Sequence, residues 1–421
     1  MTASDDFSKQ NSPASLTGSG ADTASLSGEK TEADKGLLPA GLSDLLAPQA
    51  QADADAVEAV LSCFSQFGYQ RIKPPLLEFE TSLLADGPGA ALADQTFRLL
   101  DPISRRMMGL RSDMTAQIAR ISGTRLAARP RPLRLAYGGD VMRVVPDVLN
   151  PERQLVQAGA EIIGRDDADA VVEIILAGVL GLQKAGIKAL TLDLGLPHLA
   201  RLLLGDSLDK MDGQLKDQLF EAINNRDISA LTALPIAAAP KLAEMMLASG
   251  ASGEGLRALV EELEEAAAAK LDSLLQVADK LAALLPDVAI TLDPLDMQGF
   301  GYHTSISFSL FAKGLRGAIA RGGAYRTGYD EAAVGISVYM ERVLRGLVMP
   351  DALPLIYIPA ELGFAAGLAY IQRGRHIVYG SQGAEAEAEA RALGCQFIIR
   401  GADGQPEPLQ GAGDNVKKGD L

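Results

Sequence analysis

The sequence has no tryptophan, only two cysteines and three histidines in 421 residues. Cys63 and Cys395 lie far apart and have no second cysteine or histidine at metal-ligand spacing, so we expect no metal site, no disulfide and a reducing compartment. His198 and His376 stand alone and are expected to be structural. No apolar run reaches the roughly 18 residues that span a bilayer, and the N-terminus lacks a charged start followed by an apolar stretch. These absences predict a cytoplasmic chain with no membrane segment and no secretion signal.

Positive charge is also scarce. The chain has 39 lysines and arginines against 54 aspartates and glutamates, for a formal charge of -15. Such a surface repels phosphate polyanions on average, so we expect no nucleic-acid partner. Signatures for a phosphate loop, a dinucleotide-binding turn, a nucleophile elbow and a zinc-protease helix are all missing, and we expect no cofactor. With 48% hydrophobic residues, the chain can still fill a sizeable core.

The composition divides the chain into four parts. Residues 1–35 are small and polar, with few apolar side chains to offset the entropy of ordering, and are expected to be a disordered tail. Residues 36–350 form the predicted core, with a helical insertion at about 199–285. Residues 351–402 read as a small βαβαβ appendage, and 403–421 as a flexible tail.

Hydrophobic periodicity predicts a sheet with flanking helices in the core. Segments 71–75, 95–101 and 106–111 are expected to be strands of one sheet, and 133–144 with 155–163 an antiparallel pair. Further expected elements are helices at 113–121 and 169–182, strands at 189–194, 288–292, 305–311 and 315–321, and a helix from about 335 to 347.

Charged and polar residues interrupt otherwise apolar segments at 111–115, at 143 with 157 and 161, and at 298–304. If these places converge, they form a polar pocket of the kind that binds an amino acid. The carboxylates of Asp113 and Glu161 suit an α-ammonium, and Arg143 suits a carboxylate. Gln157 and Tyr302 can hydrogen-bond a small polar ring.

Each of these side chains also has an ordinary structural role open to it. Asp113 can cap the helix that follows it, and Arg143 can pair with Glu161 across neighbouring strands. Residue types alone favour the structural interpretation, and it is the order and spacing of the motifs that favour a binding site.

The order of motifs resembles one protein family. Leu110–Gln117 reads L-R-S-D-M-T-A-Q, similar to L-R-P-D-M-T-P-Q in that family, with Ser112 in place of the usual proline. Tyr137–Arg143 together with Arg153–Glu161 resembles its motif 2. These are features of class II aminoacyl-tRNA synthetases, specifically the histidyl enzyme and its paralogue, the regulatory subunit of ATP phosphoribosyltransferase.

The resemblance runs from Gly36 to Leu347. Arg321–Tyr325 and the later Arg342 are similar to motif 3. The Asp-Met-Thr sequence favours the regulatory subunit, because the synthetase usually has Glu-Gly-Thr there. The implied fold is α+β: a class II synthetase-like, six-stranded antiparallel sheet flanked by helices, with a helical insertion and a small C-terminal α/β appendage.

Two departures point away from an active tRNA ligase. Met297–Thr304 resembles the histidine-specific R-G-L-D-Y-Y, but Gln298 stands where the synthetase keeps an arginine. A neutral amide cannot stabilise the charge that develops during adenylate formation. In addition, about fifty ordered residues are expected after Pro350, against roughly a hundred in a full anticodon-binding domain.

The resemblance therefore implies a non-catalytic regulatory subunit. It would be a cytoplasmic homodimer within a hetero-oligomer, a hetero-octamer, with the short-form ATP phosphoribosyltransferase catalytic subunit. It would activate that subunit in the first step of histidine biosynthesis and convey feedback regulation by histidine. The residues expected to line a vestigial histidine pocket are Asp113, Thr115, Arg143, Gln157, Glu161, Tyr302 and His303.

Two other functions are compatible with the same motifs. One is a divergent amino-acid-activating enzyme, a histidyl-tRNA synthetase-like ligase, which would exchange pyrophosphate into ATP when given its amino acid. The other is a synthetase-like scaffold for an unrelated partner, which co-purification would reveal.

Overall fold

The computed structural model describes residues 36–85, 87–146, 150–251, 253–296, 302–349, 353–383, 385–401 and 404–409. The tail expected at residues 1–35, most of the tail expected after 402, and the Gln298 and Gly299 positions lie outside the described residues. None of the described helices combines the length and the apolar character that crossing a bilayer needs.

The central element is a sheet, which in the described part of the chain has eight strands. They are β1 (Gln70–Arg71), β5 (Leu133–Met142), β6 (Gln154–Ile163), β7 (Leu190–Gly195), β8 (Ala289–Asp293), β9 (His303–Ala312), β10 (Ala320–Arg326) and β11 (Ala332–Tyr339). Their order across the sheet is β1-β5-β6-β11-β10-β9-β7-β8. The six inner strands are antiparallel, as the resemblance implies, and the antiparallel pairing predicted for β5 and β6 is confirmed. The edge strands β1 and β8 add parallel pairs.

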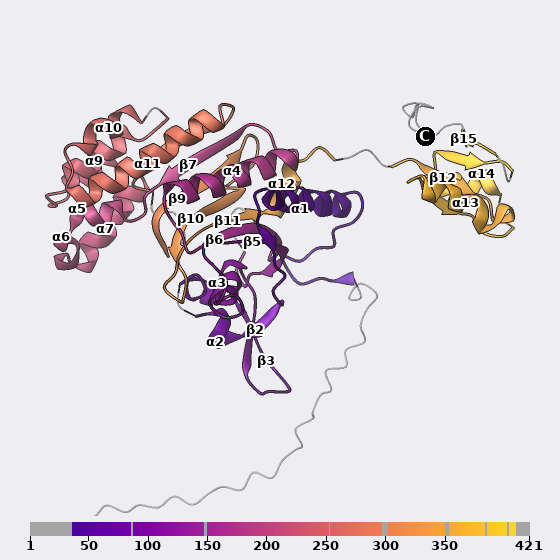
Figure 1. Ribbon diagram of the computed structural model, residues 1–421, viewed down its shortest axis with the longest axis horizontal. Coiled ribbons are helices and arrows are strands. Elements are labelled where there is room, and N and C mark those ends of the chain that lie inside the picture. The colour runs from indigo at the N-terminus through magenta and orange to yellow at the C-terminus, as the bar shows by residue number, and fades with distance from the viewer. Residues whose placement is uncertain are drawn as a thin grey trace, which may run out of the picture.

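Helices cover one face of this sheet. They are α1 (Gln49–Gln66), α4 (Ala168–Lys184) and α12 (Met340–Gly346), and Figure 1 shows them on the same side of the strands. In α1, Val60, Leu61 and Phe64 are buried at helical spacing and meet α4 in the main apolar core. The Asp167 carboxylate caps α4 by accepting hydrogen bonds from the amides of Asp169 and Ala170.

A smaller sheet lies on the opposite face. It contains β2 (Leu77–Phe79), β3 (Phe97–Leu100) and β4 (Met107–Leu110), in the order β2-β4-β3, together with α2 (Glu80–Leu83), η2 (Ala90–Gln95) and α3 (Thr115–Gly123). The prediction of one sheet for 71–75, 95–101 and 106–111 was therefore wrong. Of the three segments, only the first contributes to the main sheet, through β1, which pairs with β5. The other two segments form β3 and β4, which pair with each other.

The helix predicted from about 335 to 347 was also wrong in its first half. Residues 332–339 form β11, which hydrogen-bonds to β6 on one side and β10 on the other. Seven of its eight residues are buried. A strand buried on both faces has no alternation of apolar and polar residues, so the pattern alone cannot separate it from a helix.

Seven helices form the predicted helical insertion among the described residues. They are α5 (Leu199–Leu204), α6 (Asp206–Lys210), α7 (Gly213–Asn224), α8 (Ile228–Ala233), α9 (Ala239–Ala248), α10 (Glu254–Val260) and α11 (Glu265–Leu284). Leu256, Leu271, Leu274 and Leu281 of α10 and α11 are buried. The insertion connects the parallel strands β7 and β8.

The C-terminal residues form a second, four-stranded sheet. Its elements are β12 (Leu355–Ile358), η3 (Ala360–Leu362), α13 (Gly363–Gln372), β13 (His376–Tyr379), α14 (Ala386–Ala392), β14 (Phe397–Ile399) and β15 (Pro406–Pro408), and its strand order is β13-β12-β14-β15. The three parallel strands agree with a βαβαβ unit. Within the tail that was expected to be flexible at 403–421, the described residues include one strand, β15, which pairs antiparallel with β14.

Candidate functional site

The face of the main sheet opposite α1 and α4 carries a buried polar cluster. In the register of the sheet, Gln157 lies opposite Tyr339, and Glu161 lies opposite Gly335. Side chains two residues apart along a strand point to the same side, so Gln157, Glu161 and Ser337 share one face. Short side chains on β11 leave room for the longer ones on β6.

Glu161 is 1% exposed and lies between two tyrosines. The Tyr137 hydroxyl donates to its Oε1 at 3.0 Å, and the Tyr325 hydroxyl donates to its Oε2 at 3.0 Å. Burial raises the pKa of Glu161 to about 8, aided by the nearby Asp113 charge and opposed by hydrogen bonds from Thr115 and the two tyrosines. The Glu161 carboxyl group therefore holds a proton at neutral pH.

Gln157 connects the other members of the cluster. Its Oε1 accepts from the Met114 amide at 3.0 Å, while its Nε2 donates to Asp113 Oδ2 at 2.8 Å and to Ser337 Oγ at 2.7 Å. Asp113 Oδ1 also accepts from the Thr115 amide at 2.7 Å, so it contacts the first residue of α3, although the N-cap position itself is Met114 and not Asp113 as predicted. Asp113 thus forms part of the cluster as well as of the helix start.

No cation among the described residues pairs with Asp113 or Glu161. The ion pairs of this region join other acids, such as Glu78 to Arg120 and Glu331 to Arg131. The predicted pairing of Arg143 with Glu161 was wrong, because Glu161 faces Leu135 on β5, while Arg143 follows the far end of that strand. A buried Asp113 carboxylate without a positive partner is costly, and a ligand that supplies a cationic group to Asp113 and a hydrogen-bonding group to the protonated Glu161 would offset that cost.

The remaining predicted residues lie around this centre. The Thr115 hydroxyl is 3.2 Å from the Tyr137 hydroxyl. The Tyr302 ring packs edge-on against the Tyr325 ring, with centroids 5.8 Å apart, and 4.9 Å from the ring of His303. Among the described parts of the chain, the predicted residues other than Arg143 thus meet through direct contacts or through Tyr137 and Tyr325.

His303 and Arg143 occupy the borders of the cluster. Burial, with the nearby His198 and Arg321, lowers the pKa of His303 to about 4, so its ring is neutral and cannot act as the missing cation. Arg143 donates through Nε to the Ser112 carbonyl at 3.5 Å, and its guanidinium lies over the Tyr339 ring at 5.7 Å.

Sequence reasoning missed Tyr137, Tyr325 and Ser337. Tyr137 and Tyr325 are almost fully buried. A buried tyrosine hydroxyl normally finds a hydrogen-bond partner, so a tyrosine in an apolar strand was a usable signal. Ser337 gave no such signal, since its role depends on its register opposite Gly159.

Glycines under the cluster make room for its side chains. A Cβ on Gly335 would lie 1.7 Å from Glu161 Oε2, one on Gly159 would lie 2.5 Å from the Tyr137 hydroxyl, and one on Gly323 would lie 2.9 Å from the His303 ring. The two tyrosine hydrogen bonds hold the Glu161 carboxyl group in place, so it cannot easily move away. Glycine is therefore required opposite Glu161.

Gly335→Ala is expected to lower the free energy of unfolding by about 2 to 4 kcal/mol, because the new methyl group overlaps the buried carboxyl group. Denaturant unfolding followed by circular dichroism measures this. The control is Gly213→Ala, where a Cβ meets nothing within 4 Å, and a change within about 0.5 kcal/mol is expected. Equal stability of wild type and Gly335→Ala would mean that Glu161 does not pack against β11.

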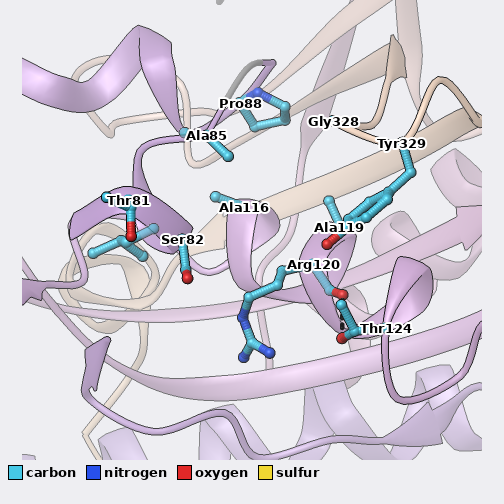
Figure 2. Close-up of a pocket in the computed structure, with 12 residues that line it drawn as sticks. Thr81, Ser82, Ala85, Pro88, Ala116, Ala119, Arg120, Thr124, Gly328 and Tyr329 are labelled. Carbon is cyan, nitrogen blue, oxygen red and sulfur yellow. Dashed lines mark hydrogen bonds between the residues drawn. The ribbon is translucent and has the colours of Figure 1, made fainter. Parts of the chain in front are cut away.

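A separate cavity of about 310 Å³ lies on a different face of α3. Figure 2 shows Ala116, Ala119 and Arg120 of α3 lining it together with Tyr329. Arg120 is already paired with Glu78 at 2.5 Å. The buried polar cluster is therefore distinct from this cavity. Within the described ranges, no group of three histidine, cysteine, aspartate or glutamate side chains is placed to hold a metal ion.

Comparisons with known proteins agree with the fold and the motifs. Residues 41–343 match the family described as histidyl-tRNA synthetase. The ATP phosphoribosyltransferase regulatory subunit of Paramagnetospirillum magneticum is 41% identical over 374 residues, which cover 88% of this chain and 98% of the relative. The corresponding protein of Rhodospirillum centenum is 40% identical over 87% of this chain and 95% of its own length.

A solved structure shows the same fold at lower identity. An ATP phosphoribosyltransferase regulatory subunit/histidyl-tRNA synthetase from Bacillus halodurans superposes with a TM-score of 0.72 at 22% identity, covering 86% of this chain and 97% of that one. With the sheet, the cluster and these relatives together, the chain belongs to the histidyl-tRNA-synthetase-like family of ATP phosphoribosyltransferase regulatory subunits.

Proposed function

We propose that this protein is a non-catalytic subunit that activates a short-form ATP phosphoribosyltransferase catalytic subunit and conveys feedback inhibition by histidine. The names of its relatives support the regulatory role. The observation that carries the histidine site is the pair of buried acids, Asp113 and Glu161, which have no cation among the described residues and lie beside hydrogen-bonding tyrosine and glutamine side chains.

In the proposed complex, the histidine α-ammonium binds to Asp113. Asp113 is ready to accept, because its present contacts are one backbone amide and the Gln157 amide. The imidazole binds to Glu161, whose carboxyl group can donate a proton to one ring nitrogen when protonated or accept one when ionised. Tyr302 and Thr115 complete the surroundings, and His303 closes one side as a neutral ring.

The assembly follows from the same proposal. We infer that two copies form a homodimer, and that homodimers combine with the catalytic subunit in a cytoplasmic hetero-octamer. A matched chain from the ATP phosphoribosyl transferase complex of Thermotoga maritima shares the fold, with a TM-score of 0.52 at 16% identity, covering 68% of this chain and 97% of that one.

The test is phosphoribosyl-ATP formation by the short catalytic subunit, with and without this protein and with histidine titrated in. We expect a strong rise in rate on adding the protein, and a loss of that rise as histidine is added. No effect of the protein on the rate would contradict the proposal.

The competing function is amino-acid activation by a histidyl-tRNA synthetase-like ligase. It requires stabilisation of the charge that develops on the carboxylate and the α-phosphate, and the sequence has a neutral Gln298 at the position that the resemblance assigns to this task. We expect no histidine-dependent exchange of pyrophosphate into ATP. Measurable exchange would replace the regulatory proposal with a catalytic one.

A further inference from the structure

Arg321 on β10 lies beside the cluster and has no counter-ion in the described part of the chain. It is opposite Ser337 of β11 and opposite Ser309 of β9 in the register of the sheet. Tyr325, four residues further along β10, points its hydroxyl at Glu161. Residues directly opposite each other on neighbouring antiparallel strands point to the same side of the sheet, so Arg321 lies on the face of Ser337, which contacts Gln157. Its Nε atom is buried and has no hydrogen-bond partner among the described residues.

The groups known to lie near Arg321 do not neutralise it. Its positive charge acts to lower the pKa of His303 and opposes the rise that burial gives to the pKa of Tyr339, and both groups are neutral. On the same row of the sheet the nearest acid is Asp193, which lies beyond Ser309 and accepts from the Thr291 hydroxyl. No described acid forms an ion pair with Arg321, so its guanidinium group is a partly buried cation available to an anion.

The cluster therefore has a negative end and a positive end. Asp113 contacts Gln157, Gln157 contacts Ser337, and Ser337 lies opposite Arg321. The first two contacts are 2.8 Å and 2.7 Å long. Two neutral polar groups thus separate one acid from one cation. This is the order of charges that an α-amino acid, with its ammonium beside its carboxylate, would match.

We propose that Arg321 binds the carboxylate of the amino acid whose ammonium binds to Asp113, and that it makes this site specific for α-amino acids over the corresponding amines. The inference rests on the proposed histidine site and assigns binding of the ligand carboxylate to a residue of β10 in the main sheet. It also replaces the earlier expectation for Arg143, whose Nε is directed to the Ser112 carbonyl. A guanidinium group suits this task, since it can bind a carboxylate through two parallel hydrogen bonds.

The experiment compares two ligands on the full-length protein by isothermal titration calorimetry. Histidine carries the carboxylate, and histamine is the same molecule without it. We expect the wild type to bind histidine on the order of 100-fold more tightly than histamine. In Arg321→Met we expect histidine to weaken to within about threefold of histamine, while the affinity for histamine itself stays unchanged.

Two further variants control for damage to the fold. Arg321→Gln keeps a polar side chain without the charge, and we expect it to lose the same discrimination. It therefore tests the proposal even if Arg321→Met fails to fold. Arg316→Met makes the same replacement at an exposed arginine near the β9–β10 turn, and it should behave as wild type. Thermal unfolding of each variant checks that the fold is intact.

The outcomes separate this inference from the function on which it rests. If the wild type binds histidine but Arg321→Met and Arg321→Gln still discriminate against histamine, Arg321 does not bind the carboxylate and only the inference is wrong. Loss of discrimination in Arg143→Met instead would assign the carboxylate to Arg143 and also overturn the inference. If the wild type binds neither ligand, the histidine site itself is wrong, and this inference with it.

Discussion

Asp113→Asn is expected to raise the histidine concentration that half-inhibits the complex by on the order of 100-fold, while activation of the catalytic subunit stays within a factor of about two. The substitution removes the negative charge proposed to bind the α-ammonium and keeps nearly the same shape. Asp113 is buried and its side-chain contacts are to Thr115 and Gln157, so no surface that could meet the catalytic subunit is altered. The assay is phosphoribosyl-ATP formation with histidine titrated in.

The matched control is Asp140→Asn. Asp140 is an exposed acid on β5 that accepts from the Gln154 amide at 3.2 Å, just as Asp113 accepts from Gln157. It should leave both activation and inhibition unchanged. If Asp113→Asn abolished activation together with inhibition, the cluster would be supporting the fold or the assembly rather than binding histidine. An unchanged inhibition curve would place the histidine site elsewhere.

The affinity for histidine is expected to be highest between about pH 6.5 and pH 8, and to fall roughly tenfold per pH unit on either side. The complex needs one proton between the imidazole and Glu161. The two pKa values that matter are that of the free histidine imidazole, about 6.5, and that of Glu161, about 8. Between them, the free protein already carries the proton on Glu161, and the free imidazole carries none. Above pH 8 binding must take up a proton, and below pH 6.5, where the imidazole is also protonated, binding must release one.

Calorimetry in two buffers with different ionisation enthalpies measures the number of protons exchanged. We expect a value near zero at pH 7.2, uptake approaching one proton at pH 9 and release approaching one proton at pH 5.5. Glu161→Gln is the control, because its amide does not titrate. The α-ammonium of histidine loses its own proton in both proteins, so the difference between the two profiles isolates Glu161. Identical profiles would show that Glu161 does not contact the ligand.

The sequence was most informative where one face of a strand is polar. Gln157 and Glu161 stand four residues apart in an apolar segment, so both their shared face and the strand pairing with 133–144 could be predicted. Asp113 and Thr115 could be placed beside them only through the order of motifs. The strand β11 was mistaken for the start of a helix, because its residues are buried on both faces and leave no periodic signal.

The contacts that shape the cluster depend on register, which local patterns do not determine. Tyr325 reaches Glu161 across β11, and this is possible because Gly335 lies between them without a side chain. Register also explains why Arg143 does not reach Glu161, because the two residues lie at opposite ends of the β5–β6 pair. A shift of one residue would have turned every one of these side chains to the helical face.

The strand β11 continues into α12 without any loop between them. Tyr339 is both the last residue of the strand and the residue that precedes the first turn of the helix. Ser337, which contacts Gln157, is therefore three residues from α12, and α12 packs against α1 on the far side of the sheet. No loop residue lies between Ser337 and α12 that could absorb a small displacement of Ser337 by a ligand. We therefore expect such a displacement to move α12 as well, so that binding on the buried face of the sheet changes the position of a helix on the other face.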